Sequence, residues 1–170
     1  MILGMSITTF ITVHVILSLI GIVAGLVVVF GMIQGKHSEV WAAAFLATTI
    51  LTSLTGFPIP PFGLDPPRIV GILSLALLAA AVAALYMFHL AGHWRWIYVT
   101  ASTAALYLNC FVGVVQTFQK VSFVTALAPT QSEPPFAIAQ LAVLGILIAL
   151  GVLAARNFHP MLRQSAFSRP

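Results

Sequence analysis

Long apolar runs alternate with short polar segments along the whole chain. Five runs lack charged residues and are long enough for a helix to cross a bilayer, whose hydrocarbon core of about 30 Å needs about 20 helical residues. They cover residues 10–30, 40–57, 69–90, 96–118 and 136–155. All ten prolines fall outside these runs, as expected for helices, because proline breaks a helix interior. The pattern predicts an all-α integral membrane bundle of five transmembrane helices, in one domain over residues 1–170.

The charged residues between these runs predict how the chain is oriented. Cytoplasmic loops of membrane proteins carry an excess of Lys and Arg. Five of the seven cationic residues fall on the side that also holds the C-terminus: Lys36, Arg95, Arg156, Arg163 and Arg169. Only Arg68 and Lys120 fall on the other side. The bias predicts an N-terminus outside and a C-terminus in the cytoplasm.

Composition narrows the classes of function. Of the 170 residues, 61% are apolar and 6% are charged, and the mean hydropathy is +1.10, whereas a soluble domain carries roughly 25% charged residues. Soluble enzymes, disordered proteins and nucleic-acid-binding proteins are therefore excluded. Cys110 is the only cysteine, so no disulfide framework is expected. We expect the lipid bilayer as the main partner, with other membrane subunits or a second copy of the chain as further partners, and no nucleic acid.

Three segments carry a resemblance to known sequences: FHLAGHWRWIY at 88–98, ALYLN at 105–109 running on to Lys120, and LAPTQSEPPF at 127–136. Together they resemble a family of small, uncharacterised, multi-pass bacterial inner-membrane proteins. The resemblance covers most of the chain and implies a location in the bacterial inner (plasma) membrane. It implies no activity, substrate or cofactor, so the functional argument depends on the residues themselves.

Small and polar residues recur at helical spacing in two of the apolar runs. In the fourth run and just beyond it, six of them share one helix face: Ser102, Ala105, Asn109, Gly113, Gln116 and Lys120. A similar stripe in the first run contains His14, Ser18, Gly21 and Gly25. A Gly-xxx-Gly pair lets two membrane helices approach closely. Both stripes are therefore typical of helix-packing seams.

Several polar groups also lie at a similar predicted depth. His14, Gln116 and Gln140 fall within roughly two helical turns of the predicted outer boundary, Lys120 lies just above them, and Asn109 is deeper. Such a layer suits an outward-opening pocket for the headgroup of a quinone or lipid, with His14 or Gln116 donating to a carbonyl oxygen. The alternative is an interhelical hydrogen-bond layer that binds nothing. These five residues are the candidate ligand-binding residues, and none is assigned as catalytic.

The remaining histidines are weaker candidates. His89 and His93 are four residues apart, a spacing that some metal sites use on one helix face. No acid or cysteine nearby in the sequence completes a ligand set, so no metal site is predicted. A buried haem would need His89 to pair with His37 or His159 at the membrane edge, and we do not expect one.

The absence of catalytic motifs favours a role in binding. No carboxylate lies within a predicted span, and the sequence has no nucleotide-binding loop and no serine or cysteine beside a histidine and an acid. The favoured interpretation is an accessory or binding subunit with an outward-facing polar layer, and whether it is an enzyme stays open. One alternative is a homo-oligomeric channel or transporter lined by Asn109, Gln116 and Lys120. The other is a haem- or quinone-dependent redox protein.

Overall fold

The computed structural model describes residues 4–59 and 66–159. Five helices are long and apolar enough to cross a membrane: α1 Ile7–Ile33, α2 Glu39–Gly56, α3 Pro66–Val82 with its π-helical continuation η1 Ala83–Met87, α4 Trp94–Lys120, and α6 Pro134–Asn157. A single helical turn, α5 Ser122–Thr125, connects α4 to α6. No element of the described ranges is a strand. The prediction of an all-α protein with five helices of spanning length is therefore confirmed.

The helix ends follow local sequence signals. Ser6 caps α1, and its hydroxyl accepts a hydrogen bond from the Thr9 N–H at 3.1 Å. Pro66 and Pro134 open α3 and α6, where the missing proline N–H costs no intrahelical hydrogen bond. The first and last helices extend beyond the predicted spans by one turn or less at each end, because polar and proline-rich residues can form the first turns outside the hydrocarbon.

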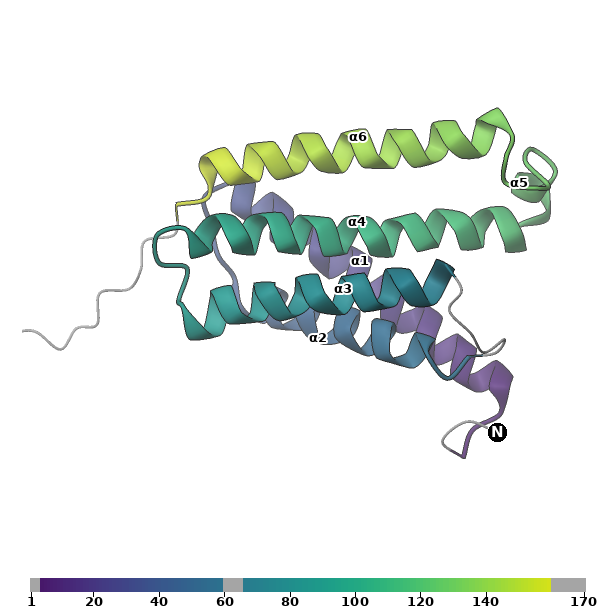
Figure 1. Ribbon diagram of the computed structural model, residues 1–170, viewed down its shortest axis with the longest axis horizontal. Coiled ribbons are helices and arrows are strands. Elements are labelled where there is room, and N and C mark those ends of the chain that lie inside the picture. The colour runs from purple at the N-terminus through teal and green to yellow at the C-terminus, as the bar shows by residue number, and fades with distance from the viewer. Residues whose placement is uncertain (1–3, 60–65, 160–170) are drawn as a thin grey trace, which may run out of the picture.

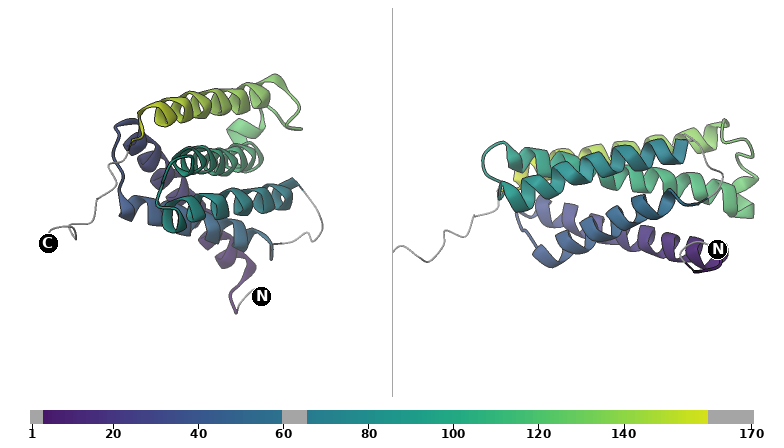
Figure 2. Two further views of the ribbon diagram at one scale, coloured as in Figure 1. Left: turned by 60° about the vertical axis from the view of Figure 1, so that its left-hand side comes forward. Right: turned by 60° about the horizontal axis from the view of Figure 1, so that its bottom comes forward.

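Helix α4 lies in the middle of the bundle, where it contacts α1, α3 and α6 (Figure 1). Helix α1 packs against α2 and crosses behind α4 obliquely (Figures 1 and 2). It approaches α6 at one end of the bundle, where the Asn157 side-chain amide donates to the Ile33 carbonyl at 3.1 Å. We call that end the predicted cytoplasmic end, and the end where α1 begins and α4 stops the predicted outer end.

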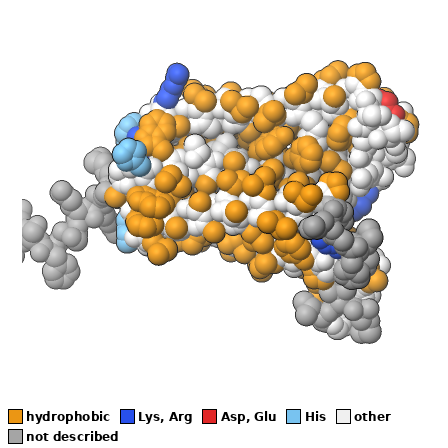
Figure 3. Space-filling model, viewed as in Figure 1, with side chains coloured by type: hydrophobic (Ala, Val, Ile, Leu, Met, Phe, Trp, Pro, Cys, Tyr) orange, Lys and Arg blue, Asp and Glu red, His pale blue; other side chains and the backbone are white. Residues whose placement is uncertain are grey.

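On the face drawn in Figure 3, apolar side chains cover the flank of the bundle, charged residues lie at its two ends, and histidines are visible at the predicted cytoplasmic end. Helix α6 is the most exposed of the five, with Leu147 and Ala154 as its buried residues. A flank of this kind matches a hydrocarbon environment, which holds apolar side chains at no cost and excludes charge. The distribution supports insertion of the bundle across a membrane.

The third predicted span was too long at its C-terminal end. It was expected to continue to residue 90, with Gly92 ending the helix, but the helix widens into the π-turn η1 and ends at Met87. His89 and Leu90 then take left-handed backbone angles, with φ values of 48° and 59°, which cost about 1–2 kcal/mol per residue. The turn is held because the Leu90 N–H donates to the Ala84 carbonyl at 2.9 Å and the Leu90 side chain is buried.

Candidate functional site

The predicted stripes of α1 and α4 face one another in the interior of the bundle. The Ser18 hydroxyl donates to Asn109 Oδ1 at 2.7 Å, and Asn109 Nδ2 donates to the Ser18 carbonyl at 3.3 Å. Asn109 is 7% exposed. Because a buried amide without partners costs free energy in hydrocarbon, this reciprocal pair explains how α1 and α4 tolerate a polar residue at this depth. Asn109 therefore acts as a packing residue between the two helices.

The two glycines of the α1 stripe bring three helices into contact. A Cβ atom on Gly21 would lie 3.0 Å from Thr49 Oγ1 on α2 and 3.1 Å from Asn109 Nδ2 on α4. A Cβ atom on Gly25 would lie 2.8 Å from both Leu106 on α4 and Phe45 on α2. These approaches are too close for a larger residue without rearrangement, so the stripe is a packing seam in this part of the bundle.

His14 lies beyond this seam, toward the predicted outer end, and is oriented by Thr55 on α2. Its Nδ1 atom is 2.9 Å from Thr55 Oγ1. The Thr55 hydroxyl has a single proton, and it donates that proton to the Leu51 carbonyl at 2.7 Å. We therefore assign the His14 Nδ1–H as the donor to Thr55, and in this tautomer Nε2 of the neutral ring is an acceptor without a hydrogen bond to the described part of the chain.

Gln116 and Lys120 lie toward the same end of the seam as His14. His14 lies one helical turn before Ser18 on α1, and Gln116 lies two turns after Asn109 on α4. Because α1 and α4 are antiparallel, both positions lie on the outer side of the Ser18–Asn109 pair. Lys120 is one turn further and lies within electrostatic range of the His14 ring. Gln116 is half-buried, and neither it nor Lys120 makes a hydrogen bond to the described part of the chain. The three side chains thus keep unused hydrogen-bonding capacity.

Gln140 lies on a different side of α4. Its Nε2 donates to the Phe111 carbonyl at 3.3 Å, between α4 and α6, and its Oε1 is buried with no partner among the described residues. Phe111 is two residues from Asn109, which corresponds to 200° around the helix at 100° per residue. The predicted polar layer is therefore divided between two helix interfaces. Gln140 lies in the interface between α4 and α6, and His14 lies in the interface of α1 with its neighbours.

The histidines at the predicted cytoplasmic end do not form a ligand set in the described ranges. No group of three or more His, Cys, Asp or Glu residues there could hold a metal ion. His89 and His93 do not share a helix face as the sequence suggested, because both lie in the turn between Met87, where the helix ends, and Trp94, where α4 begins. Both side chains are exposed.

His37 instead packs in an aromatic cluster. Its ring centroid lies 6.2 Å from those of Tyr98 and Phe158, and the latter two are fully buried. Burial lowers the pKa of His37, and the charge of Glu39 offsets part of that shift. A cavity of about 440 Å³ adjoins the ring between α1 and α2, with Lys36 in its lining.

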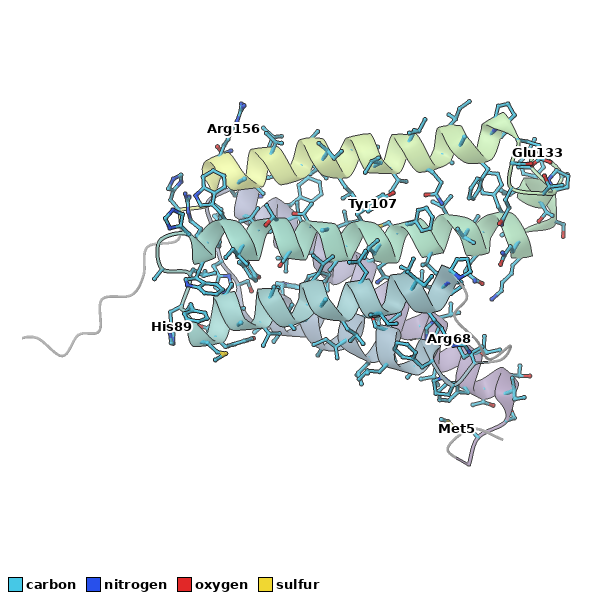
Figure 4. All side chains as sticks on the ribbon, in the orientation of Figure 1. Met5, Arg68, His89, Tyr107, Glu133 and Arg156 are labelled. Carbon is cyan, nitrogen blue, oxygen red and sulfur yellow. The ribbon has the colours of Figure 1, made fainter. Side chains whose placement is uncertain are left out.

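A largely apolar groove of about 350 Å³ runs between α4 and α6. Trp96 lines it near the start of α4, and Tyr107 lines it further along that helix, on the side facing α6 (Figure 4). Thr103 and Ala104 form its middle on α4, and Gly151 faces them from α6. The Thr103 hydroxyl is buried with no partner in the described ranges.

This groove was not predicted from the sequence. Thr103, Ala104 and Tyr107 lie within about one turn of α4, and a small-residue face flanked by aromatic residues is a visible signal. That the face meets Gly151 could not be known, because the order of helices around the bundle is not encoded in the spacing of residues along one helix.

No protein-family model, no curated protein and no solved structure matches this chain. The functional argument therefore depends on the side chains described above.

Proposed function

We propose that the protein is a binding or accessory subunit of the bacterial inner (plasma) membrane, which holds the headgroup of a membrane-dissolved amphiphile. The site lies at the predicted outer end of the α1–α4 seam and consists of His14, Gln116 and Lys120. The ligand class is a quinol or a lipid with a hydroxyl-bearing headgroup. No catalytic role is part of the proposal.

The hydrogen bond from His14 to Thr55 carries this proposal. With Nδ1–H assigned as the donor to Thr55, Nε2 of the neutral ring accepts a hydrogen bond from a ligand hydroxyl. Gln116 and Lys120 supply the donors for the carbonyl or phosphate oxygens of the same headgroup.

Asn109 and Gln140 have supporting roles in this proposal. Asn109 holds α1 against α4 through Ser18, which sets the position of His14 one turn further along α1. Gln140 holds α6 against α4 through the Phe111 carbonyl. Neither side chain needs to touch the ligand.

The packing of Gly113 favours this proposal over the channel alternative. A Cβ atom on Gly113 would lie 3.7 Å from the Ile22 side chain of α1, so the α4 stripe meets another helix of the same chain at this level. At Gly113 the stripe therefore packs within the chain, where the channel alternative requires it to face water. The redox alternative requires a chromophore or bound quinone, which an absorption spectrum of the purified protein detects.

The proposal is tested by calorimetric titration of the detergent-solubilised protein with a short-chain quinol, the matching quinone and a short-chain phospholipid. We expect the quinol or the phospholipid to bind, and the quinol to bind more tightly than the quinone. Gln116→Leu should weaken binding about tenfold, the effect of losing roughly one well-formed hydrogen bond. Gln140→Leu is the matched control and should bind like the wild type. Absence of binding by all three ligands, or equal loss in both variants, would overturn the proposal.

A further inference from the structure

We propose that the groove between α4 and α6 binds one acyl chain of an anionic phospholipid, whose phosphate contacts Arg95 at the predicted cytoplasmic end. This site is separate from the one in the proposed function. It lies on another face of α4 and at the opposite end of the bundle, so each site can fail without the other.

The groove has the shape of a chain-binding site. It is lined by small residues at its centre, Ala104 and Gly151, and by larger ones at both ends, Trp96 and Tyr107. The eleven helical steps from Trp96 to Tyr107 extend about 16 Å along α4 at 1.5 Å per residue, close to half of a hydrocarbon core of about 30 Å. One acyl chain of a phospholipid in the nearer leaflet covers that depth.

The charge at one end of the groove selects the headgroup. The Arg95 guanidinium carbon lies 4.9 Å from the centre of the Trp96 ring, which lines the groove. The Arg95 Nη1 donates to the Phe158 carbonyl just after α6. A guanidinium has five N–H donors, of which this bond uses one, and its planar arrangement suits a phosphate. Arg95 is thus held in place where the groove meets the membrane surface.

A second arginine at the same end of the bundle serves as a control. Arg156 lies on α6, is exposed, and points away from α4 in Figure 4. Loss of Arg156 removes the same charge from the same end without altering the groove. A lipid held only by the general positive charge of this end would respond equally to both arginines.

Native mass spectrometry of the full chain tests the proposal. The protein is exchanged into nanodiscs that contain equal amounts of phosphatidylglycerol and phosphatidylcholine with identical acyl chains, and is then released. We expect the wild type to retain phosphatidylglycerol in preference to phosphatidylcholine. Arg95→Gln should reduce that preference about tenfold, as for a lost charge-assisted contact, while Arg156→Gln should keep it. Equal loss in the two variants would overturn the headgroup assignment.

A second pair of variants tests the acyl chain. Ala104→Leu fills the groove and should reduce the retention of both lipids, whereas Ala149→Leu on the exposed face of α6 should not. Unchanged retention in Ala104→Leu would overturn the groove assignment. Competition by water-soluble glycerol phosphate at the same concentration would show an anion site without a chain, and would overturn it as well. Calorimetric titration with the quinol, which has no phosphate to contact Arg95, separates this test from that of the proposed function.

Discussion

The Nδ1 of His14 lies 2.9 Å from the Thr55 hydroxyl and joins α1 to α2 by a hydrogen bond, one turn before Ser18 meets Asn109 on α4. The two contacts give the two parts of the α1 stripe different roles. At Ser18 the polar groups satisfy one another between helices. At His14 the Thr55 hydroxyl accepts from one ring nitrogen and leaves the other free, so the ring keeps an acceptor that packing does not use.

The Ser18–Asn109 pair stabilises the bundle. Ser18→Ala removes the donor to Asn109 Oδ1 and should lower the free energy of unfolding by about 0.6–1.7 kcal/mol, the range measured for hydrogen bonds between membrane helices. Reversible unfolding in mixed detergent micelles measures the change. Thr12→Ala is the control, because the exposed Thr12 hydroxyl bonds only to the Thr8 carbonyl of its own helix. Equal effects of the two substitutions would contradict the interhelical role.

The close approach at Gly25 allows a sharper packing test. Gly25→Ala places a Cβ atom 2.8 Å from Leu106 and Phe45 and should destabilise the bundle by about 1–3 kcal/mol through overpacking. Gly145→Ala on α6 has nothing within 4 Å of the new atom and should be neutral or slightly stabilising, since alanine favours helix more than glycine. Thermal unfolding of both variants in the same detergent compares them. A neutral Gly25→Ala variant would show that α1 can shift away from its neighbours.

The unpartnered hydroxyl of Thr103 predicts a gain in stability. Thr103→Val replaces a buried oxygen without a described partner by a methyl group, and should stabilise the bundle by about 1 kcal/mol, the lower range for an unsatisfied buried group. Thr100→Val removes a hydroxyl that bonds to the Trp96 carbonyl on the exposed side of α4, and should change stability little. A loss of stability in Thr103→Val would mean that the hydroxyl has a partner in the membrane.

Cysteine labelling separates a packing seam from a pore. In a Cys110→Ala background, Gly113→Cys should resist a water-soluble thiol reagent in intact vesicles, because the residue faces Ile22 of α1. Lys120→Cys, at the exposed end of α4, should react from the side of the membrane on which that end lies. Rapid labelling of Gly113→Cys would favour the channel alternative. The side from which Lys120→Cys reacts also determines the orientation of the chain.

The pKa of His37 predicts a pH dependence of stability. Burial lowers the pKa of the folded state below the ordinary value of 6.5, so the unfolded chain binds a proton at a higher pH than the folded chain. The free energy of unfolding should therefore fall as the pH drops below 6.5, and stop falling below the folded pKa. His37→Phe should reduce this dependence, and His93→Gln on the exposed turn should retain it. Unchanged pH dependence in His37→Phe would contradict the assignment.

Much of the fold could be predicted because charge and proline mark the same boundaries. Lipid excludes both Arg and Glu, and proline interrupts helical hydrogen bonding, so the two signals coincide at the five helices. His89 was misplaced because no charge or proline separates it from the preceding apolar run. The π-turn η1 and the left-handed backbone that follows depend on how the chain returns to α4, which is a tertiary effect.

The sequence predicted how far along the bundle each candidate residue lies, but not which neighbouring helix its side chain faces. His14, Gln116 and Gln140 do lie toward one end of the bundle, as counting residues along each helix indicates. Gln140, however, faces Phe111 on the α6 side of α4, since the rotation of each helix is set by its neighbours. The tautomer of His14 was equally inaccessible, because it depends on a Thr55 hydroxyl 41 residues away.

Native mass spectrometry of the wild-type protein, extracted gently from its own membrane, tests the central claim most directly. The account predicts an added mass that matches one quinol or hydroxyl-bearing lipid, and its loss in Gln116→Leu but not in Gln140→Leu. Bare protein in the wild type, or the same number of bound molecules in all three proteins, would contradict the claim that His14, Gln116 and Lys120 form a headgroup site.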